Sequence, residues 1–162
     1  SKSGVGSGGM ASKLVAARIA SWSGVRTVIA SAQRKGAVSA IVSGERLGTT
    51  FEAHQRTLTA RKLWIAFAAE TAGRIIVDAG AQAALTTKNT SLLPAGVTGV
   101  EGAFVSGATV EIVGSDGLVF ARGMSAVSAA ELLDVIGMQT SALPQGMHHE
   151  VVHRDDLVVM PK

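Results

Sequence analysis

The 162-residue sequence contains no cysteine, no tyrosine and only three prolines, and aromatic residues make up 4% of it. The absence of cysteine excludes a disulfide framework. The scarcity of aromatic rings argues against a surface that stacks nucleic-acid bases, because such a surface usually needs several exposed rings. No apolar run approaches the ~20 residues that span a bilayer, and the first residues lack the charged and then apolar order of a secretory signal. We therefore expect a soluble protein, cytoplasmic by default, with no membrane partner.

Hydrophobic residues make up 47% of the sequence, which indicates a globular protein. Its length of 162 residues is enough for one ordinary domain or two small ones. Lysine and arginine number 15 against 12 aspartates and glutamates, which gives a net charge of +3. This mild excess permits an anionic ligand without requiring nucleic acid.

Residues 4–13 form a glycine-rich segment, GVGSGGMASK, which leads directly into an apolar helical pattern over residues 10–20. Glycine allows close approach of the backbone to an anion, and the first N–H groups of a helix favour negative charge. Lys13 falls in the first turn or so, where its ammonium can reach back over the loop. The spacing is neither that of a P-loop nor that of a Rossmann loop. The segment predicts either a phosphate-binding loop or a flexible Gly/Ser tail before a helix.

The part up to about residue 60 has the order loop, helix, strand that is typical of an α/β layer. Leu14, Ala17 and Ser21 share one helical face and are expected to be buried, and Gly24 ends the helix. The β-branched run 25–30 predicts a strand of a parallel sheet that is covered on both faces. The following loop contains two further ligand candidates, Arg34 and Lys35, whose alternative role is solvated loop charge. Residues 37–42 are compatible with helix or strand, and residues 48–51 favour a strand.

Beyond a polar connector at 52–62, short strands and turns predominate, whereas residues 63–67 are apolar enough to dock on a core. We expect a strand at 74–77 and a helix at 79–87 with Asp78 as its cap. Residues 110–121 predict a β-hairpin with Asp-Gly at its tip. Ser128 and Glu131 form a capping-box pattern that opens a helix to Ile136, and late strands follow at 151–159. These elements predict a small β-rich, barrel-like domain.

Six segments in this order resemble the C-terminal part of the bacterial glutamate 5-kinases over essentially the whole chain. They are GSGGMASKLVAARIA, VIAS, GTTF, RKLWI, SLLPAGV and VHRDDL. The resemblance implies an α/β fold, the end of an amino acid kinase domain with a three-layer sheet at 1–60. It further implies a connector at 61–73 and a β-rich PUA pseudo-barrel at 74–162.

The family uses ATP and Mg²⁺ to phosphorylate the γ-carboxylate of L-glutamate in proline biosynthesis, and the resemblance implies the same activity, inhibition by proline and a homo-oligomer. It also assigns Lys13 as the catalytic residue that offsets charge on the transferring phosphoryl group. The cofactor-binding residues that it implies are Ser7, Gly8, Gly9, Met10, Ala11, Ser12 and Lys13. Ser7 replaces a common threonine and keeps the hydroxyl, whereas Arg34-Lys35-Gly36 departs more from the usual Lys-Pro-Gly, which weakens a role for Lys35.

The N-terminal half of the family's kinase domain, with most of the glutamate pocket, has no counterpart before Ser1. We therefore expect the chain to be inactive alone, and to self-associate through a sheet edge and apolar faces that the other half would cover. The alternative is that the PUA domain acts as an RNA-binding or regulatory module without catalysis. Few basic residues cluster in 75–162, so a regulatory or assembly role ranks above RNA.

His148, His149, Glu150 and His153 invite a zinc-site interpretation, but the flanking valines favour strand, where positions alternate faces. Asp155 and Asp156 are adjacent, which favours a turn or ion-pair role over a Mg²⁺ carboxylate pair. No metal ligands are therefore predicted. Trp22 and Trp64 are interpreted as packing anchors rather than nucleotide stackers, and His54 has no evident role.

Overall fold

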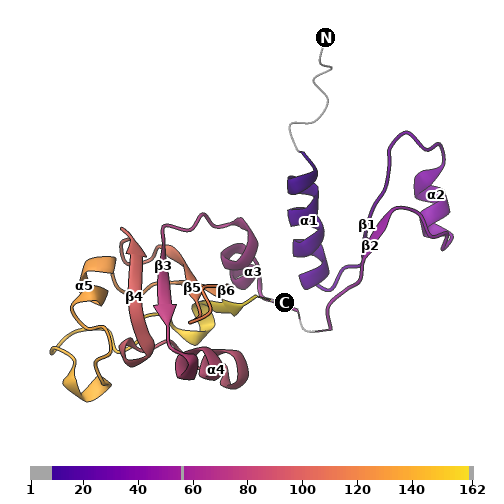
Figure 1. Ribbon diagram of the computed structural model, residues 1–162. Coiled ribbons are helices and arrows are strands. Elements are labelled where there is room, and N and C mark those ends of the chain that lie inside the picture. Colours follow the sequence, from indigo (N-terminus) through magenta and orange to yellow (C-terminus); the bar gives the residue numbers. More distant parts are fainter. Residues whose placement is uncertain (1–8, 56, 161–162) are drawn as a thin grey trace, which may run out of the picture. The chain divides into compact units, whose positions relative to one another are not determined.

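The computed structural model describes residues 9–55 and 57–160, and the chain divides into two compact units, residues 1–63 (unit 1) and 64–162 (unit 2). The chain passes from one unit to the other between Leu63 and Trp64, inside the connector predicted at 61–73. In the described ranges, no helix is both long enough and apolar enough to cross a membrane. Each unit is described separately below (Figure 1).

In its described residues, 9–55 and 57–63, unit 1 contains three helices and a two-stranded antiparallel sheet. In chain order the elements are α1 (Met10–Trp22), β1 (Thr27–Ile29), α2 (Ala37–Val42), β2 (Thr49–Phe51) and α3 (Ala60–Leu63). Gly24, at φ +82°, follows the end of α1 as predicted. Residues 37–42, which the sequence left undecided, are a helix. Gly48 is required before β2, because a Cβ there would lie 2.1 Å from the carbonyl oxygen of Ile29.

The predicted strand of a parallel sheet covered on both faces is wrong for the described part of unit 1. β1 pairs antiparallel with β2, with Thr27 opposite Phe51, and all three of its residues are only partly buried. An apolar β-branched run predicts a strand, but it does not specify the strand's neighbour. The connection through α2, residues 30–48, is long enough for either strand direction, so its length does not decide the pairing. Leu14 is also not part of the buried stripe, since it is 42% exposed while Ala17 and Ser21 are buried.

Unit 2 is built on a five-stranded sheet with the order β4-β3-β5-β6-β7. Its strands are β3 (Gly73–Val77), β4 (Val97–Gly102), β5 (Thr109–Val113), β6 (Val119–Met124) and β7 (Leu157–Val159). β3 and β5 are parallel neighbours, and the other pairs are antiparallel. The helices are the π-helix η1 (Trp64–Ala68), α4 (Ala79–Lys88) and α5 (Ala129–Leu133), with short 3₁₀ turns η2 (Pro94–Gly96), η3 (Thr140–Ala142) and η4 (Arg154–Asp156).

Three local predictions in unit 2 are confirmed. The Asp78 carboxylate accepts the N–H of Ala81 at 2.7 Å and so caps α4. β5 and β6 form the hairpin around Asp116-Gly117, with Gly117 at φ +76°. The Ser128 hydroxyl and the Glu131 carboxylate form a reciprocal capping box at the start of α5. The predicted fold class, an α/β portion followed by a small β-rich domain, is therefore the one observed.

Other predicted elements differ from the structure. α5 ends at Leu133 rather than Ile136, and the chain continues through turns to Gly137, at φ +74°. Residues 151–159 are not one strand: Val152 makes an isolated bridge to Leu92, η4 intervenes, and β7 is three residues long. His153 caps the 3₁₀ turn η4 by accepting the N–H of Asp155, so the adjacent aspartates lie in a turn, one of the two roles predicted for them.

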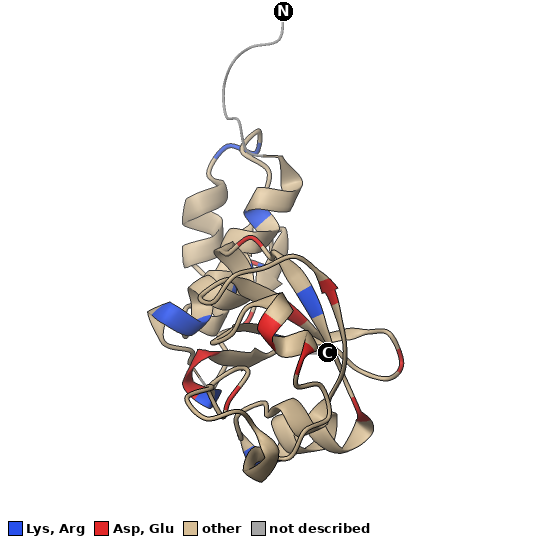
Figure 2. Ribbon diagram, turned by 90° about the vertical axis from the view of Figure 1, so that its left-hand side faces the viewer, with Lys and Arg blue, Asp and Glu red and all other residues tan. Residues whose placement is uncertain are grey.

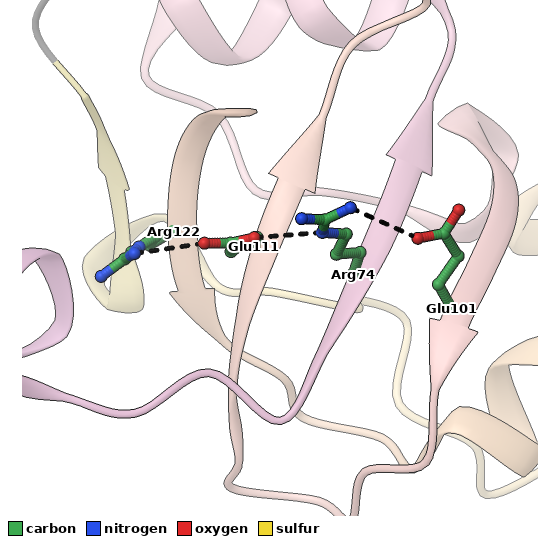
Figure 3. A network of polar contacts seen from close by, with 4 residues as sticks. All are labelled: Arg74, Glu101, Glu111 and Arg122. Atoms are coloured by element: carbon green, nitrogen blue, oxygen red, sulfur yellow. Dashed lines mark hydrogen bonds and ion pairs between the residues drawn. The ribbon is translucent and has the colours of Figure 1, made fainter. Parts of the chain in front are cut away.

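The two faces of the unit 2 sheet have different chemistry. One face carries the fully buried Ile75, Val110 and Ile112, which join the main hydrophobic core. The other carries a row of directly paired charged residues, which Figure 3 shows in the order Arg122, Glu111, Arg74, Glu101. Glu111 lies between the two arginines at 3.1 Å from each, and Arg74 is 3.7 Å from Glu101. This charge ladder (Arg122, Glu111, Arg74, Glu101) joins four adjacent strands.

Candidate functional site

The start of α1 is open to an anionic ligand in the described residues. Gly9 is the N-cap in extended backbone (φ −67°, ψ −176°), and no described side chain caps the helix there. The Ser12 hydroxyl donates to the Gly9 carbonyl at 2.8 Å, so it does not occupy the N–H groups of the first turn. The first turn also contains no acidic residue. Backbone N–H groups and the positive end of the helix dipole are therefore available to a phosphate.

Lys13 is the fourth residue of α1, and its side chain lines an open groove of about 490 Å³ between α1 and β1. Small side chains leave this space, since the helix contributes Ala16, Ala17 and Ala20 to its wall. Figure 1 shows α1 alongside the β1–β2 pair, and the two elements are in contact. The predicted site residues 9–13 are thus brought together at one end of α1. Ser7 and Gly8, also predicted to contact the nucleotide, lie outside the described residues.

The opposite end of α1 is fixed to the chain that follows β2. The Ser21 hydroxyl donates to the Glu52 carbonyl, and the Ser21 carbonyl accepts the N–H of His54 at 2.9 Å. The Trp22 and His54 rings stack with centroids 3.8 Å apart and planes 18° apart. His54, for which the sequence suggested no role, therefore helps to hold α1, and Trp22 is an anchor as predicted. These contacts fix the C-terminal end of α1, whereas Lys13 lies near its N-terminal end.

The two further ligand candidates in the loop after β1, Arg34 and Lys35, have different surroundings. Arg34 forms an ion pair with Glu45, so its charge is largely compensated within unit 1. Lys35 is exposed in the turn before α2, next to Gly36, which adopts φ +72°. The structure therefore favours the solvated-charge interpretation for Arg34, and a ligand role for Lys35 stays a prediction.

Charge is divided sharply along the chain, which its net charge of +3 conceals. Residues 1–63 contain ten lysines and arginines and two glutamates. Residues 64–162 contain five lysines and arginines and ten aspartates and glutamates. Figure 2 marks the described members of both classes on the ribbon. The first acidic residue in the sequence is Glu45, far beyond Lys13. The unit that carries the candidate site is therefore strongly basic, and this signal was readable by counting each half separately.

The histidine-rich segment of unit 2 does not assemble a metal site in the part of the chain that the structure describes. His153 lies 3.7 Å from the Glu150 carboxylate and 3.6 Å from that of Asp155, and its Nδ1 accepts the N–H of Asp155 at 3.1 Å. These contacts place His153 and Asp155 in a polar turn. Trp64 is 50% exposed, so the packing-anchor prediction is wrong for it, and its neighbours Ile65 and Ala66 are the buried residues of that segment.

Comparison with known proteins gives matches to both parts of the chain. A PUA domain family model matches residues 73–146. A glutamate 5-kinase of Trichlorobacter lovleyi is 45% identical over 99% of this chain, which covers 44% of that protein. A glutamate 5-kinase of Myxococcus xanthus is 44% identical over 98% of this chain, which covers 43% of it. A PUA domain of Aeropyrum pernix K1, solved in a tartrate complex, is 28% identical with a TM-score of 0.42, and the match covers 58% of this chain and 50% of that one.

The chain therefore spans less than half the length of the curated relatives that it matches, and it aligns with their C-terminal part. The resemblance to that part of the glutamate 5-kinases is confirmed, as is the presence of a PUA domain.

Proposed function

We propose that this chain, which belongs by sequence with the C-terminal part of the glutamate 5-kinases, is the nucleotide-binding end of such a kinase followed by its PUA domain. The whole kinase would use ATP and Mg²⁺ to convert L-glutamate into L-glutamyl 5-phosphate in the cytoplasm, in the pathway to proline. The residues that bind glutamate would come from the part of the relatives that this chain does not cover. The chain alone is therefore expected to be inactive.

The single observation that supports this assignment is the position of Lys13. It lies in the first turn of a 13-residue helix whose N-cap has no described side-chain partner, and it lines the groove beside that helix. A nucleotide phosphate at this place would receive hydrogen bonds from the first-turn N–H groups. The Lys13 ammonium would offset the charge that spreads over the equatorial oxygens of the transferring phosphoryl group. The excess of ten basic residues over two acidic ones in residues 1–63 favours the same polyanionic ligand.

The residues of this chain fit the phosphates better than they fit the metal. Mg²⁺ is usually held by one or two carboxylates together with substrate phosphates. No carboxylate side chain precedes Glu45 in the sequence, and that of Glu45 is paired with Arg34. We therefore assign phosphate binding to residues 9–13, and no step of the proposal passes through the metal.

The test of this proposal supplies the N-terminal part of the kinase that this chain does not cover. The chain is combined with the uncovered N-terminal part of the Trichlorobacter lovleyi kinase, and acyl phosphate is trapped as the hydroxamate with ATP, Mg²⁺ and L-glutamate. Lys13→Ala should lower kcat by about 100- to 1,000-fold, the range for removing one preorganised charge stabiliser. Arg18→Ala, a change of another exposed cation on α1, is the matched control and should leave kcat nearly unchanged. Equal losses in the two variants, or no activity with the unmodified chain, would contradict the proposal.

Self-association of the 162-residue chain used alone also follows from the proposal, because the part of the relatives that it does not cover would be absent from the sample. Six of its large apolar residues are at least 41% exposed: Met10, Leu14, Val15, Val25, Val38 and Val42. Such exposure favours association through apolar contacts. A homo-oligomer and inhibition by proline are proposed for the whole kinase on the same basis. A monodisperse monomer of the 162-residue chain in light scattering would count against the association.

The PUA match supports a second candidate function, an RNA-binding or regulatory module that acts without catalysis. The ten acidic and five basic residues of 64–162 disfavour the phosphate contacts that dominate RNA affinity, so regulation or assembly is the favoured form of this alternative. Binding of the chain to structured RNA, weakening steeply with salt and unaffected by Lys13→Ala, would support the RNA form instead.

A further inference from the structure

The π-helix η1 lies against the unit 2 sheet before the residues that match the PUA model begin. It covers Trp64–Ala68, contacts β6 and β7, and buries Ile65 and Ala66 almost completely. The N–H of Ala69 closes the wide turn on the Trp64 carbonyl at 2.8 Å. Single π-helical turns are rare and occur frequently at functional positions. η1 is therefore a structural part of unit 2 that lies outside the residues matched by the PUA model.

One side chain of the sheet connects η1 to the charge ladder. Arg122, in β6, donates from Nη1 to the Ala66 carbonyl at 3.1 Å and from Nη2 to the Glu111 carboxylate at 3.1 Å. The last carbonyl groups of a helix have no partner within the helix, so an arginine that reaches one of them acts as a cap from outside. Because a guanidinium has a rigid planar fork, pairing with Glu111 also orients Arg122 toward η1.

The apolar part of this docking is small. Ile65 and Ala66 are buried, whereas Trp64 is half exposed and the segment is only five residues long. Together with α3, which directly precedes it, η1 forms a continuous helical run over residues 60–68, which is still shorter than the ~12–15 residues below which isolated helices are marginal in water. The docked state of η1 therefore depends on a few apolar contacts and on the Arg122 bond.

We propose that η1 is a releasable strap on the PUA sheet and that Arg122, oriented by Glu111, is its clamp. Release frees the Ala66 carbonyl and the Ile65 side chain to water while the sheet stays folded. Arg122 is a positioning residue in this device.

The test uses hydrogen exchange by mass spectrometry on the full 162-residue chain. Arg122→Met removes both donors and keeps most of the aliphatic stem. The segment 64–69 should then exchange about 10- to 100-fold faster, the factor expected for losing a hydrogen bond to a charged group. Segments from β3 and β5 should keep their protection. Arg74→Met is the matched control, because Arg74 pairs with the same Glu111 carboxylate but does not touch η1.

Equal acceleration of segment 64–69 in the two methionine variants would overturn the proposal, since a general weakening of the ladder would then explain it. No acceleration in Arg122→Met would overturn it as well. If Arg122→Met also loses protection in β3 and β5, Arg122→Lys decides. Lysine keeps a positive charge beside Glu111 but not the fork that reaches Ala66, so segment 64–69 should still exchange faster while the sheet is protected. Unchanged exchange in the lysine variant refutes the clamp.

Discussion

Glu111 is the centre of the charge ladder, and replacing it with glutamine measures most directly how much the ladder contributes to the stability of unit 2. Its side chain is 16% exposed and accepts from Arg74 and Arg122 at 3.1 Å each. Two unit charges 4 Å apart interact by about 4 kcal/mol at an effective dielectric of 20, and desolvation of both partners offsets part of this. Glutamine keeps the volume but turns one acceptor into a donor that faces a guanidinium. We expect Glu111→Gln to lower the free energy of unfolding by about 1.5–3 kcal/mol, the range for a hydrogen bond to a charged group.

The matched control is Glu101→Gln at the outer end of the same ladder. Glu101 is 60% exposed and lies 3.7 Å from Arg74, so its pair should contribute less than about 1 kcal/mol. Both variants are compared by urea unfolding, followed through Trp64 emission in a Trp22→Phe background. With a slope of ~2 kcal/mol/M, the midpoint should fall by about 1 M for Glu111→Gln and by less than 0.5 M for Glu101→Gln. Equal midpoints for the two variants would refute the reasoning that burial gives the central carboxylate its larger effect.

Two further predictions concern packing and pH. Gly123→Ala should cost about 1–3 kcal/mol in urea unfolding, because the new Cβ would lie 2.4 Å from Cγ1 of Val152 and 3.0 Å from the Asp156 carbonyl. Gly107→Ala meets no atom within 4 Å of the new Cβ, so any loss there comes from its φ of +85° alone. An unchanged urea midpoint for Gly123→Ala would argue against the steric explanation. The backbone and hydroxyl hydrogen bonds of Ser128 lower the pKa of Glu131, so its stabilising effect is full above the ordinary glutamate pKa of ~4.3 and is lost as the pH falls through the lowered folded value. In Glu131→Gln, which removes the titrating carboxyl and keeps the Ser128 cap, the urea midpoint should therefore differ most from the parent near neutral pH and converge with it in acid. A constant difference across this range would contradict the assignment.

Local features of the fold could be predicted because their causes lie within a few residues. The Asp78 cap, the Ser128 and Glu131 capping box and the Asp-Gly hairpin each depend on side chains that bond to nearby backbone. The glycine-rich start of α1 and the position of Lys13 were likewise read from adjacent residues.

The pairings that depend on distant residues could not be predicted in the same way. The Arg122 bond to Ala66 joins positions 56 apart, and the Arg74 bond to Glu111 joins positions 37 apart. β1 was assigned the wrong neighbour because its apolar residues indicate burial and not the direction of a partner strand. Trp64 lies on a helix that buries the next two residues instead, and ring size alone does not reveal which face of a short helix is covered.

The parallel pairing of β3 with β5 has a consequence for how unit 2 is made. β4 follows β3 in the chain but takes the outer edge, so the centre of the sheet stays incomplete until β5 arrives and pairs with β3. Such non-local pairing slows folding, because loops must close before the contacts that stabilise them form. During synthesis residues 1–63 leave the ribosome before unit 2, and in unit 2 the middle strand β5 is encoded some 35 residues after β3. A ribosome stalled before Thr109 would hold a nascent chain with an open sheet centre, which is the stage at which a chaperone would be most useful.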